Sequence, residues 1–223
     1  MPTMTRLDEV FVLNLGDSEN RFHPDWLGEV QLHLDTVLAA DGPKSLVTTA
    51  SGKFFSNGLD LDWLGAHSDQ FLSYVNEVHR LFERVLALDV PSVAAIQGHC
   101  FAGGAMLALG HDFRVMRADR GFFCLPEVDI NIPFTRGMVG LIQARLSKRT
   151  AHEAMTTGRR YGGTDALAAG IVDAVAHEDD VLSTAVEIAR PLAGKAGATL
   201  GTIKQRMYAE ALIALQNKDN PLD

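Results

Sequence analysis

Short apolar runs rich in β-branched residues alternate with longer segments of helical period along this chain. Such alternation is typical of a layered α/β protein. The apolar runs predict strands at 10–15, 45–50, 93–97, 113–116, 121–124 and 171–175. Helices are predicted at 26–40, 69–88 and 104–109, with another starting near residue 150 and a mostly helical segment from residue 181 onward.

The segment 69–88 gives the clearest helical signal. Its apolar residues recur at steps of three and four, namely Phe71, Val75, Val78, Phe82, Val85 and Leu86. Two boundary signals stand farther along the chain. Thr150 and Glu153 have the spacing of a capping box at a helix start, and Gly170 stands where a helix would end before a strand.

No linker, internal repeat or low-complexity tract interrupts this pattern. With 223 residues, of which 47% are hydrophobic and 22% charged, the chain is long enough to bury a full core. We therefore predict one globular unit. Its core spans residues 1–175, and a helical region spans residues 176–223 within the same unit.

Charge and residue types narrow the classes of function. The formal net charge of −8 argues against a general nucleic-acid or anionic-membrane binder, because basic surface holds such partners. Any bound phosphate must be met by a local cluster of Lys and Arg. Cys100 and Cys124 stand in no CxxC pattern, and the histidines show no HExxH spacing, so neither a disulfide framework nor a metal is expected.

The sequence also predicts where the protein is located. The N-terminal segment lacks a basic start followed by a long apolar run, and no stretch is long enough to span a bilayer. The C-terminal NPLD differs from an SKL-type peroxisomal address. We therefore expect a cytoplasmic protein, and the sparse cysteines fit a reducing cytosol.

The first segment with candidate chemistry is KFFSNGLDL at 53–61, a strand end that turns at Gly58. After such a turn the backbone N–H of Leu59 can point outward and meet an anionic oxygen. The alternative is an ordinary strand-to-helix turn with no chemical role.

A second turn, at 98–104, opens a short apolar helix and places the N–H of Gly103 at the helix N-terminus. Free amides and the helix dipole favour negative charge there. Two such amides on one carbonyl oxygen would stabilise an enolate or tetrahedral anion. Neither a phosphate-binding P-loop nor a dinucleotide fingerprint fits, because Ala105 follows Gly104 and the GxGxxG spacing is missing.

The third segment, 122–133, holds Glu127 among apolar neighbours. Desolvation raises the pKa of a carboxylate, which is the direction that a general acid or base at neutral pH needs. The alternative is a surface glutamate in an alternating strand.

Together these segments resemble the crotonase, or enoyl-CoA hydratase/isomerase, superfamily. FFSNGLDL is similar to its FSxGxDL loop, GHCFAGGAMLAL to its GxAxGGGxxLAL loop, and LPEVDINIP to its PExxLGxxP segment, in the expected order and spacing. Downstream, AMTTGR at 154–159 and DALAAGIV at 165–172 look like the family's LTGR and EAxxxGLV stretches. The likeness runs from about residue 15 to residue 175.

The resemblance implies a fold and a set of roles. The expected fold is the ClpP/crotonase-like α/β superhelix of repeated β-β-α turns, followed by C-terminal helices that form a trimer or a dimer of trimers. Leu59 and Gly103 become the oxyanion-hole donors, and Glu127 becomes the catalytic carboxylate. The implied substrate is an acyl-CoA thioester, with no separate cofactor.

One departure from the family pattern points to a particular reaction. Hydratases of the family use two glutamates, and Met106 occupies the position of the first, where a thioether cannot transfer a proton. A single carboxylate suffices to move a double bond from C3 to C2. The pattern therefore looks like the Δ3,Δ2-enoyl-CoA isomerases of the plant peroxisomal type.

Two further departures lie on the loops. Ala102 replaces the first glycine of the family's triplet, and Asn131 replaces the glycine of the PE segment. Asn131 is tolerable there because asparagine also adopts positive φ.

Other residues are candidates for substrate contacts. The substrate would lie along the first turn and beside the second, against Ser56, Asn57, Gly58, Asp60, Leu61 and Met106. The phosphates of coenzyme A need basic partners, for which Arg21, Lys53, Lys204 and Arg206 are candidates. Trp63 and Phe71 would line an acyl tunnel, or else belong to the core.

Several alternatives remain open at this stage. Asp129 would share a face with Glu127 in an extended strand and serve as a second acid. Cys100 with His99 and His111 is either a nucleophile with its base or a small buried thiol. Asp112 and Arg114 form a structural pair.

Two rival functions also remain. The first is another crotonase activity, either a hydratase or a thioester hydrolase. The second is a non-catalytic acyl-CoA-binding scaffold.

Overall fold

The computed structural model describes residues 1–218 of the chain. The strands are β1 (Thr3–Leu7), β2 (Val10–Asn14), β3 (Ser45–Thr49), β4 (Phe54–Ser56), β5 (Ser92–Ile96), β6 (His99–Phe101), β7 (Phe113–Arg117), β8 (Phe123–Cys124) and β9 (Ala174–Ala176). The helices are α1 (Pro24–Ala39), α2 (Leu61–Ala66), α3 (Phe71–Leu86), α4 (Gly103–Gly110), α5 (Arg136–Arg145), α6 (Lys148–Thr157), α7 (Gly163–Ala168), α8 (Val181–Ala189), α9 (Ala198–Met207) and α10 (Ala209–Leu215). Three short 3₁₀ segments lie at Ser68–Gln70, Glu178–Asp180 and Arg190–Lys195.

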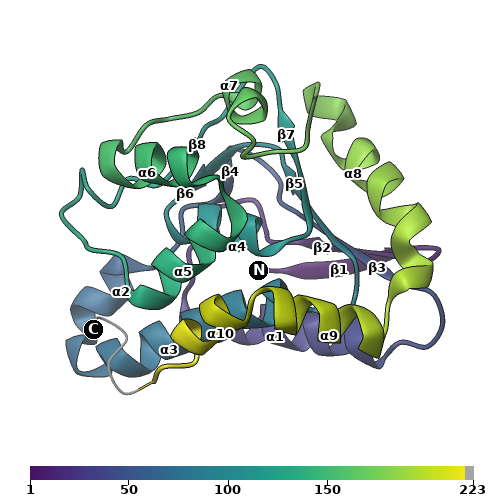
Figure 1. The fold of residues 1–223 in the computed structure, drawn as a ribbon, viewed down its shortest axis with the longest axis horizontal. Coiled ribbons are helices and arrows are strands. Elements are labelled where there is room, and N and C mark those ends of the chain that lie inside the picture. The colour runs from purple at the N-terminus through teal and green to yellow at the C-terminus, as the bar shows by residue number, and fades with distance from the viewer. Residues whose placement is uncertain (219–223) are drawn as a thin grey trace.

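From β3 onward, consecutive strands alternate between two sheets. The larger sheet has the order β1-β2-β3-β5-β7-β9, in which only the β1–β2 pair is antiparallel, and the smaller has the order β4-β6-β8. The pairs β3–β4, β5–β6 and β7–β8 thus each place one strand in either sheet before the chain enters a helix (Figure 1). This is the predicted superhelix of β-β-α turns.

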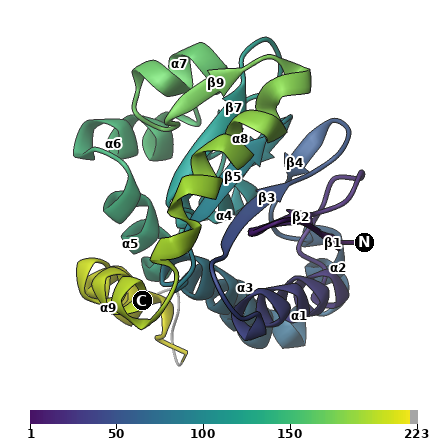
Figure 2. The same ribbon diagram turned by 90° about the vertical axis from the view of Figure 1, so that its right-hand side faces the viewer.

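The inner strands β3 and β5 of the larger sheet are buried on both faces, which explains their valine and alanine residues. Helix α8 covers one face, lying against β3, β5 and β7 (Figure 2). Its Val181 and Ala185 belong to one buried cluster with Val47 and Val93 of the sheet. Helices α1, α3 and α4 close the other face over the main core. A helix that is apolar on all sides must lie inside, and all eight residues of α4 are buried.

Some predicted boundaries are wrong for local reasons. Strand β9 starts later than residue 171, because the N–H of Ile171 still caps α7 through a 2.8 Å bond to Ala166 O. Gly170 itself has φ of 69°, as expected of a helix end. The predicted capping box is incorrect, since α6 starts earlier, with Ser147 Oγ accepting from the N–H of Thr150.

The C-terminal helices pack on the rest of the chain. Helix α10 lies against α5 and α3, and α9 is tied to the core by Lys204, whose Nζ lies 2.7 Å from Asp112 Oδ2. Asp112 therefore pairs with Lys204, and Arg114 pairs with Asp173 instead of forming the predicted Asp112–Arg114 pair. The predicted helical region runs to residue 223, and its residues 219–223, which include all of NPLD, lie outside the described part.

Within residues 1–218, no helix is both long enough and apolar enough to cross a membrane.

Candidate active site

The first turn is shaped by the buried side chain of Ser56. Its hydroxyl accepts from the N–H of Gly58 at 3.0 Å and donates to Asn20 O at 2.8 Å. Gly58 then turns the chain with φ of 77°, a value that favours glycine. Ser56 is fully buried and does not line the cavity described below, so its predicted substrate contact is wrong, and its role is to hold the turn.

The second turn lies in direct contact with the first. A Cβ atom on Gly58 would stand 2.4 Å from Gly103 N, and one on Gly103 would stand 3.0 Å from Leu59 Cδ1. Only glycine at both positions allows this approach. Within the described chain, neither the N–H of Leu59 nor that of Gly103 donates to a protein acceptor. The two amides that the sequence singled out are therefore neighbours. Leu59 lines the cavity described below, whereas Gly103, which follows Ala102 in sequence, is buried and is absent from the cavity wall.

Ala102, the residue between β6 and α4, has strained backbone angles. Its φ of 51° and ψ of −124° belong to a region that glycine adopts readily and alanine rarely. We expect Ala102→Gly to raise the free energy of unfolding by about 1 kcal/mol, because relief of strain outweighs the greater entropy of an unfolded glycine. Urea denaturation at equilibrium measures this, and a less stable variant would contradict it.

A cavity of about 520 Å³ opens beside the two turns. Its wall is mostly apolar and comes from the first turn, the second turn, the segment 126–135, α3 and α5. Leu59, Ala102 and Glu127 line it together. A volume of this size suits an organic ligand rather than an ion.

Glu127 is the buried carboxylate of this cavity. It is 6% exposed, and its Oε2 has no hydrogen-bond partner in the described chain. Burial raises its pKa to about 7. The group can therefore take up or release a proton near neutral pH, which is what general base catalysis requires.

Asp129 does not share this environment. The segment after Pro126 is a series of turns, in which the N–H of Asp129 bonds to Pro126 O at 2.9 Å, and not the extended strand that would align the two carboxylates. Asp129 is exposed, and its carboxylate approaches Gly158. The structure thus gives no support to a second acid at this position.

The basic candidates for phosphate binding are dispersed. Arg21 lines the cavity, but its guanidinium is paired with Glu19 at 2.5 Å and with Asp62. Lys53 lies outside the cavity, with its ammonium 5.1 Å from the centre of the Phe54 ring. Lys204 is buried in its pair with Asp112, so it is not a phosphate ligand.

Some of the remaining predicted contacts line the cavity and others do not. Asn57, Leu61 and Phe71 line the cavity. Asp60 caps α2 by accepting from the N–H of Trp63, and Trp63 stacks on His67, with ring centres 4.4 Å apart. The other predicted contacts, Gly58 and Arg206, are also absent from the cavity wall.

The cysteine and histidine candidates are not a catalytic pair. Cys100 is fully buried and burial raises the pKa of its thiol, while His111 is held by Leu107 O at 2.9 Å and Thr48 Oγ1 at 2.8 Å. No group of His, Cys, Asp or Glu within residues 1–218 has the arrangement of a metal site.

Comparison with known proteins shows the family of this chain. The family model described as enoyl-CoA hydratase/isomerase matches residues 9–219. This chain belongs to that family. Enoyl-CoA delta isomerase 3 of Arabidopsis thaliana is 36% identical to it over 221 residues, spanning 94% of this chain and 93% of the plant protein. Peroxisomal enoyl-CoA delta isomerase 2 of the same plant is 34% identical over 224 residues, with the same shares covered.

Solved structures of enoyl-CoA hydratase/isomerase proteins show the same fold. Human mitochondrial delta3-delta2-enoyl-CoA isomerase matches with a TM-score of 0.87 and 26% identity over 96% of this chain and 85% of the human chain. An enoyl-CoA hydratase from Mycobacterium ulcerans matches with a TM-score of 0.89 and 28% identity over 96% of this chain and 94% of its own. The resemblance and the fold predicted from the three motifs are confirmed.

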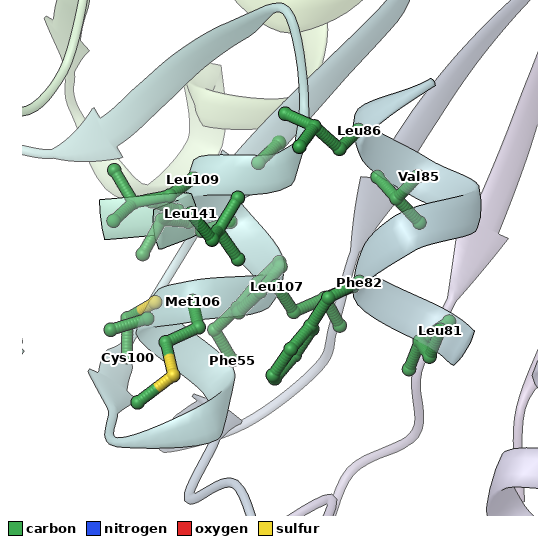
Figure 3. Close-up of a cluster of buried hydrophobic side chains, with 14 of the residues drawn as sticks. Phe55, Leu81, Phe82, Val85, Leu86, Cys100, Met106, Leu107, Leu109 and Leu141 are labelled. Atoms are coloured by element: carbon green, nitrogen blue, oxygen red, sulfur yellow. The ribbon is translucent and has the colours of Figure 1, made fainter. Parts of the chain in front are cut away.

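Met106 does not line the cavity. It is 1% exposed and packs in the core beside Cys100 and Leu107, away from the cavity wall (Figure 3). The predicted contact between Met106 and substrate is therefore wrong. Its thioether fills space under α4.

Part of the cavity wall was not predicted from the sequence. Ile130, Ile132, Thr135 and Met138 line it, and they come from the loop after Glu127 and the start of α5. A signal for α5 exists, because Thr135 precedes the apolar residues at 138, 141 and 142 and caps the helix by accepting from the N–H of Met138.

Proposed function

We propose that this protein is an isomerase that moves the double bond of a 3-enoyl-CoA to the 2-trans position. The observation that carries the proposal is the buried, unpartnered carboxylate of Glu127 in the same cavity as Leu59 and Ala102. The delta isomerases of Arabidopsis thaliana and the human isomerase support it as relatives.

The reaction needs one base and one anion site. Glu127 takes a proton from C2 of the thioester, and the N–H groups of Leu59 and Gly103 bind the oxygen of the resulting dienolate. Glu127 then returns the proton to C4, so the carboxylate is regenerated and no atom is gained or lost. No cofactor beyond the coenzyme A of the substrate takes part.

The carboxylates of the cavity favour isomerisation over hydration. Hydration requires one group to activate water and another to protonate carbon. Met106 stands where the hydratases have the first of their two glutamates, and a thioether cannot transfer a proton. Asp62 also lines the cavity, but it is paired with Arg21. Asp129 is exposed and absent from the cavity wall. A single carboxylate free to accept a proton therefore remains.

Assembly and location complete the proposal. A homotrimer or a dimer of trimers would cover the exposed apolar residues Ile203, Met207 and Ile213 of α9 and α10. The cytoplasmic location remains a prediction, since one of the plant relatives is peroxisomal by name.

Incubation with a 3-enoyl-CoA and, separately, a 2-enoyl-CoA tests the activity. From the 3-enoyl-CoA we expect a conjugated 2-enoyl product, which is detected by the absorbance of its conjugated thioester. From the 2-enoyl-CoA we expect no 3-hydroxy product. Formation of a 3-hydroxyacyl-CoA would favour the hydratase alternative. Release of free coenzyme A would favour hydrolysis, and binding without turnover of either substrate would favour a scaffold.

The acid side of the pH profile reports the state of Glu127. The base must be ionised, and its pKa is raised to about 7 by burial. We expect kcat/KM to rise about tenfold per pH unit below pH 7 and to level off above it. A profile that is already flat from pH 5 upward would show that the working carboxylate is solvated and would contradict the assignment.

A further inference from the structure

The loop that carries Glu127 has few contacts of its own. Between β8 and α5 the chain forms no strand or helix, and its backbone hydrogen bonds are local turns such as Ile132 N–H to Glu127 O at 3.0 Å. Residues 128–133 are all exposed. The position of the Glu127 side chain therefore depends on how the two ends of this loop are anchored.

The upstream end is anchored by the backbone. Phe123 and Tyr161 exchange two hydrogen bonds of 2.9 Å, and Phe123 also pairs with Cys100 in the smaller sheet. These bonds hold the chain up to Cys124, and the fully buried side chain of Leu125 continues the anchor into the core.

The downstream end is anchored by a side chain. Thr135, 3% exposed, caps α5 with its Oγ1, which accepts from the N–H of Met138 at 3.1 Å. The same Oγ1 forms a 2.7 Å hydrogen bond with Nε2 of His79. His79 comes from the middle of α3 and is fully buried. This bond thus ties the end of the loop to a different helix.

Helices α3, α5 and α10 pack against one another (Figure 1). A Cβ atom on Gly137 of α5 would stand 3.0 Å from His79 Cε1 and 2.9 Å from Leu215 Cδ2 of α10. The start of α5 is therefore wedged between α3 and α10. Burial lowers the pKa of His79 to about 4, so the imidazole is neutral at pH 7 and pairs with Thr135 as an uncharged group.

A buried polar pair of this kind contributes little net stability, but it selects one geometry, because an unmade hydrogen bond in the interior is costly. Thr135 and Met138 line the cavity together with Glu127. A change in the cap of α5 would therefore move both the cavity wall and the end of the loop.

We propose that the hydrogen bond between His79 and Thr135 positions the loop 126–134 so that the carboxylate of Glu127 stays buried in the cavity. Both are then positioning residues for the proton transfer. The catalytic consequence rests on the proposed function, whereas the burial of Glu127 is a property of the unliganded protein and can be measured without substrate.

A loosened loop would let water reach Glu127, and the pKa of Glu127 would report this. The other charged groups on the cavity wall, Arg21 and Asp62, are paired with each other. Desolvation is the main cause of the raised pKa of Glu127. A loop that opens to water would consequently lower that pKa toward its ordinary value, and a change of fold stability elsewhere would not.

Thr135→Val removes the hydroxyl at nearly constant volume, and Thr135→Ser keeps it. We expect the pKa of Glu127, followed by carbon-13 NMR titration of the ligand-free protein, to fall from about 7 to about 6 or below in the Val variant. The kcat for isomerisation should fall about tenfold. The Ser variant should match the wild type in both measurements.

Thr150→Val serves as the matched control, since Thr150 is also buried and donates a 2.9 Å bond, to Ala169 O, but does not line the cavity. We expect it to lower stability without moving the pKa of Glu127. The double variant His79→Leu with Thr135→Val leaves no buried imidazole facing an apolar side chain and guards against loss of folding. The pKa of Glu127 in the double variant should equal its pKa in Thr135→Val alone.

Two results would overturn the proposal. One is a Thr135→Val protein of lowered stability in which Glu127 titrates as in the wild type. The other is a double variant whose pKa falls well beyond that of the single variant, because the two residues would then act separately. A lowered pKa in a protein without isomerase activity would support the positioning role and refute the proposed function.

Discussion

Replacing Glu127 with Gln is expected to lower kcat for isomerisation by about 10³-fold, within the range that removal of a general base costs. The amide keeps the shape of the side chain but cannot accept the proton from C2. Turnover of a 3-enoyl-CoA by purified variant and wild type measures the loss. Asp129→Asn is the matched control, because Asp129 is nearby in sequence but exposed, and its activity should be unchanged.

The Glu127→Gln variant should also be more stable than the wild type at high pH. Burial raises the pKa of Glu127 from 4.5 to about 7, so folding favours the protonated form. The stability due to this preference is fully present below pH 4.5 and is lost as pH rises through 7. We expect the advantage of Gln over Glu to grow by about 3 kcal/mol between pH 4.5 and pH 8, measured by denaturant unfolding. An advantage that is constant with pH would show that Glu127 is solvated.

Gly58→Ala is expected to lower kcat/KM by about 10²- to 10³-fold. The new Cβ would stand 2.4 Å from Gly103 N, so the two turns must separate and the two amides can no longer bind one oxygen. The measurement is steady-state isomerisation with the folded variant, whose integrity circular dichroism can confirm.

Gly42→Ala separates this steric effect from backbone strain. Gly42 has the same φ of 77° as Gly58, but a Cβ there would meet nothing within 4 Å. We expect it to cost about 1 kcal/mol of stability and to leave kcat/KM unchanged. If Gly58→Ala remained as active as Gly42→Ala, the anion site would not lie at the contact between the two turns.

The sequence predicted the parts of the site that are made by backbone turns. Gly58 and Gly103 stand out as turn residues between apolar runs, and Glu127 stands out as a carboxylate with apolar neighbours on both sides. Their contact in space could not be seen from the residues alone, because it depends on how β4 and β6 lie side by side. The family resemblance supplied that step.

The side-chain predictions failed where partners come from distant segments. Lys204 looked like a free cation but pairs with Asp112, which lies 92 residues earlier in the chain. Arg21 is surrounded by carboxylates of its own turn and of the first turn, including Asp60 at 3.8 Å. In the sequence, Met106 shows that the first of the two hydratase glutamates is missing. Only the fold shows that its thioether lies in the core. Pairing and burial are properties of tertiary structure, which local patterns do not contain.

The contact between α5 and α10 has a consequence for how the protein is made. A Cβ atom on Gly140 would stand 3.3 Å from Ala211 Cα, and one on Gly137 would stand 2.9 Å from Leu215 Cδ2, so the helix behind one cavity wall is translated after every strand of the two sheets. Domains begin to fold while the ribosome is still extending the chain. The sheets and both turns can form on the nascent chain, but this wall gains its backing only after residue 215 has left the exit tunnel. A prematurely terminated chain would therefore combine a nearly complete fold with an unsupported site.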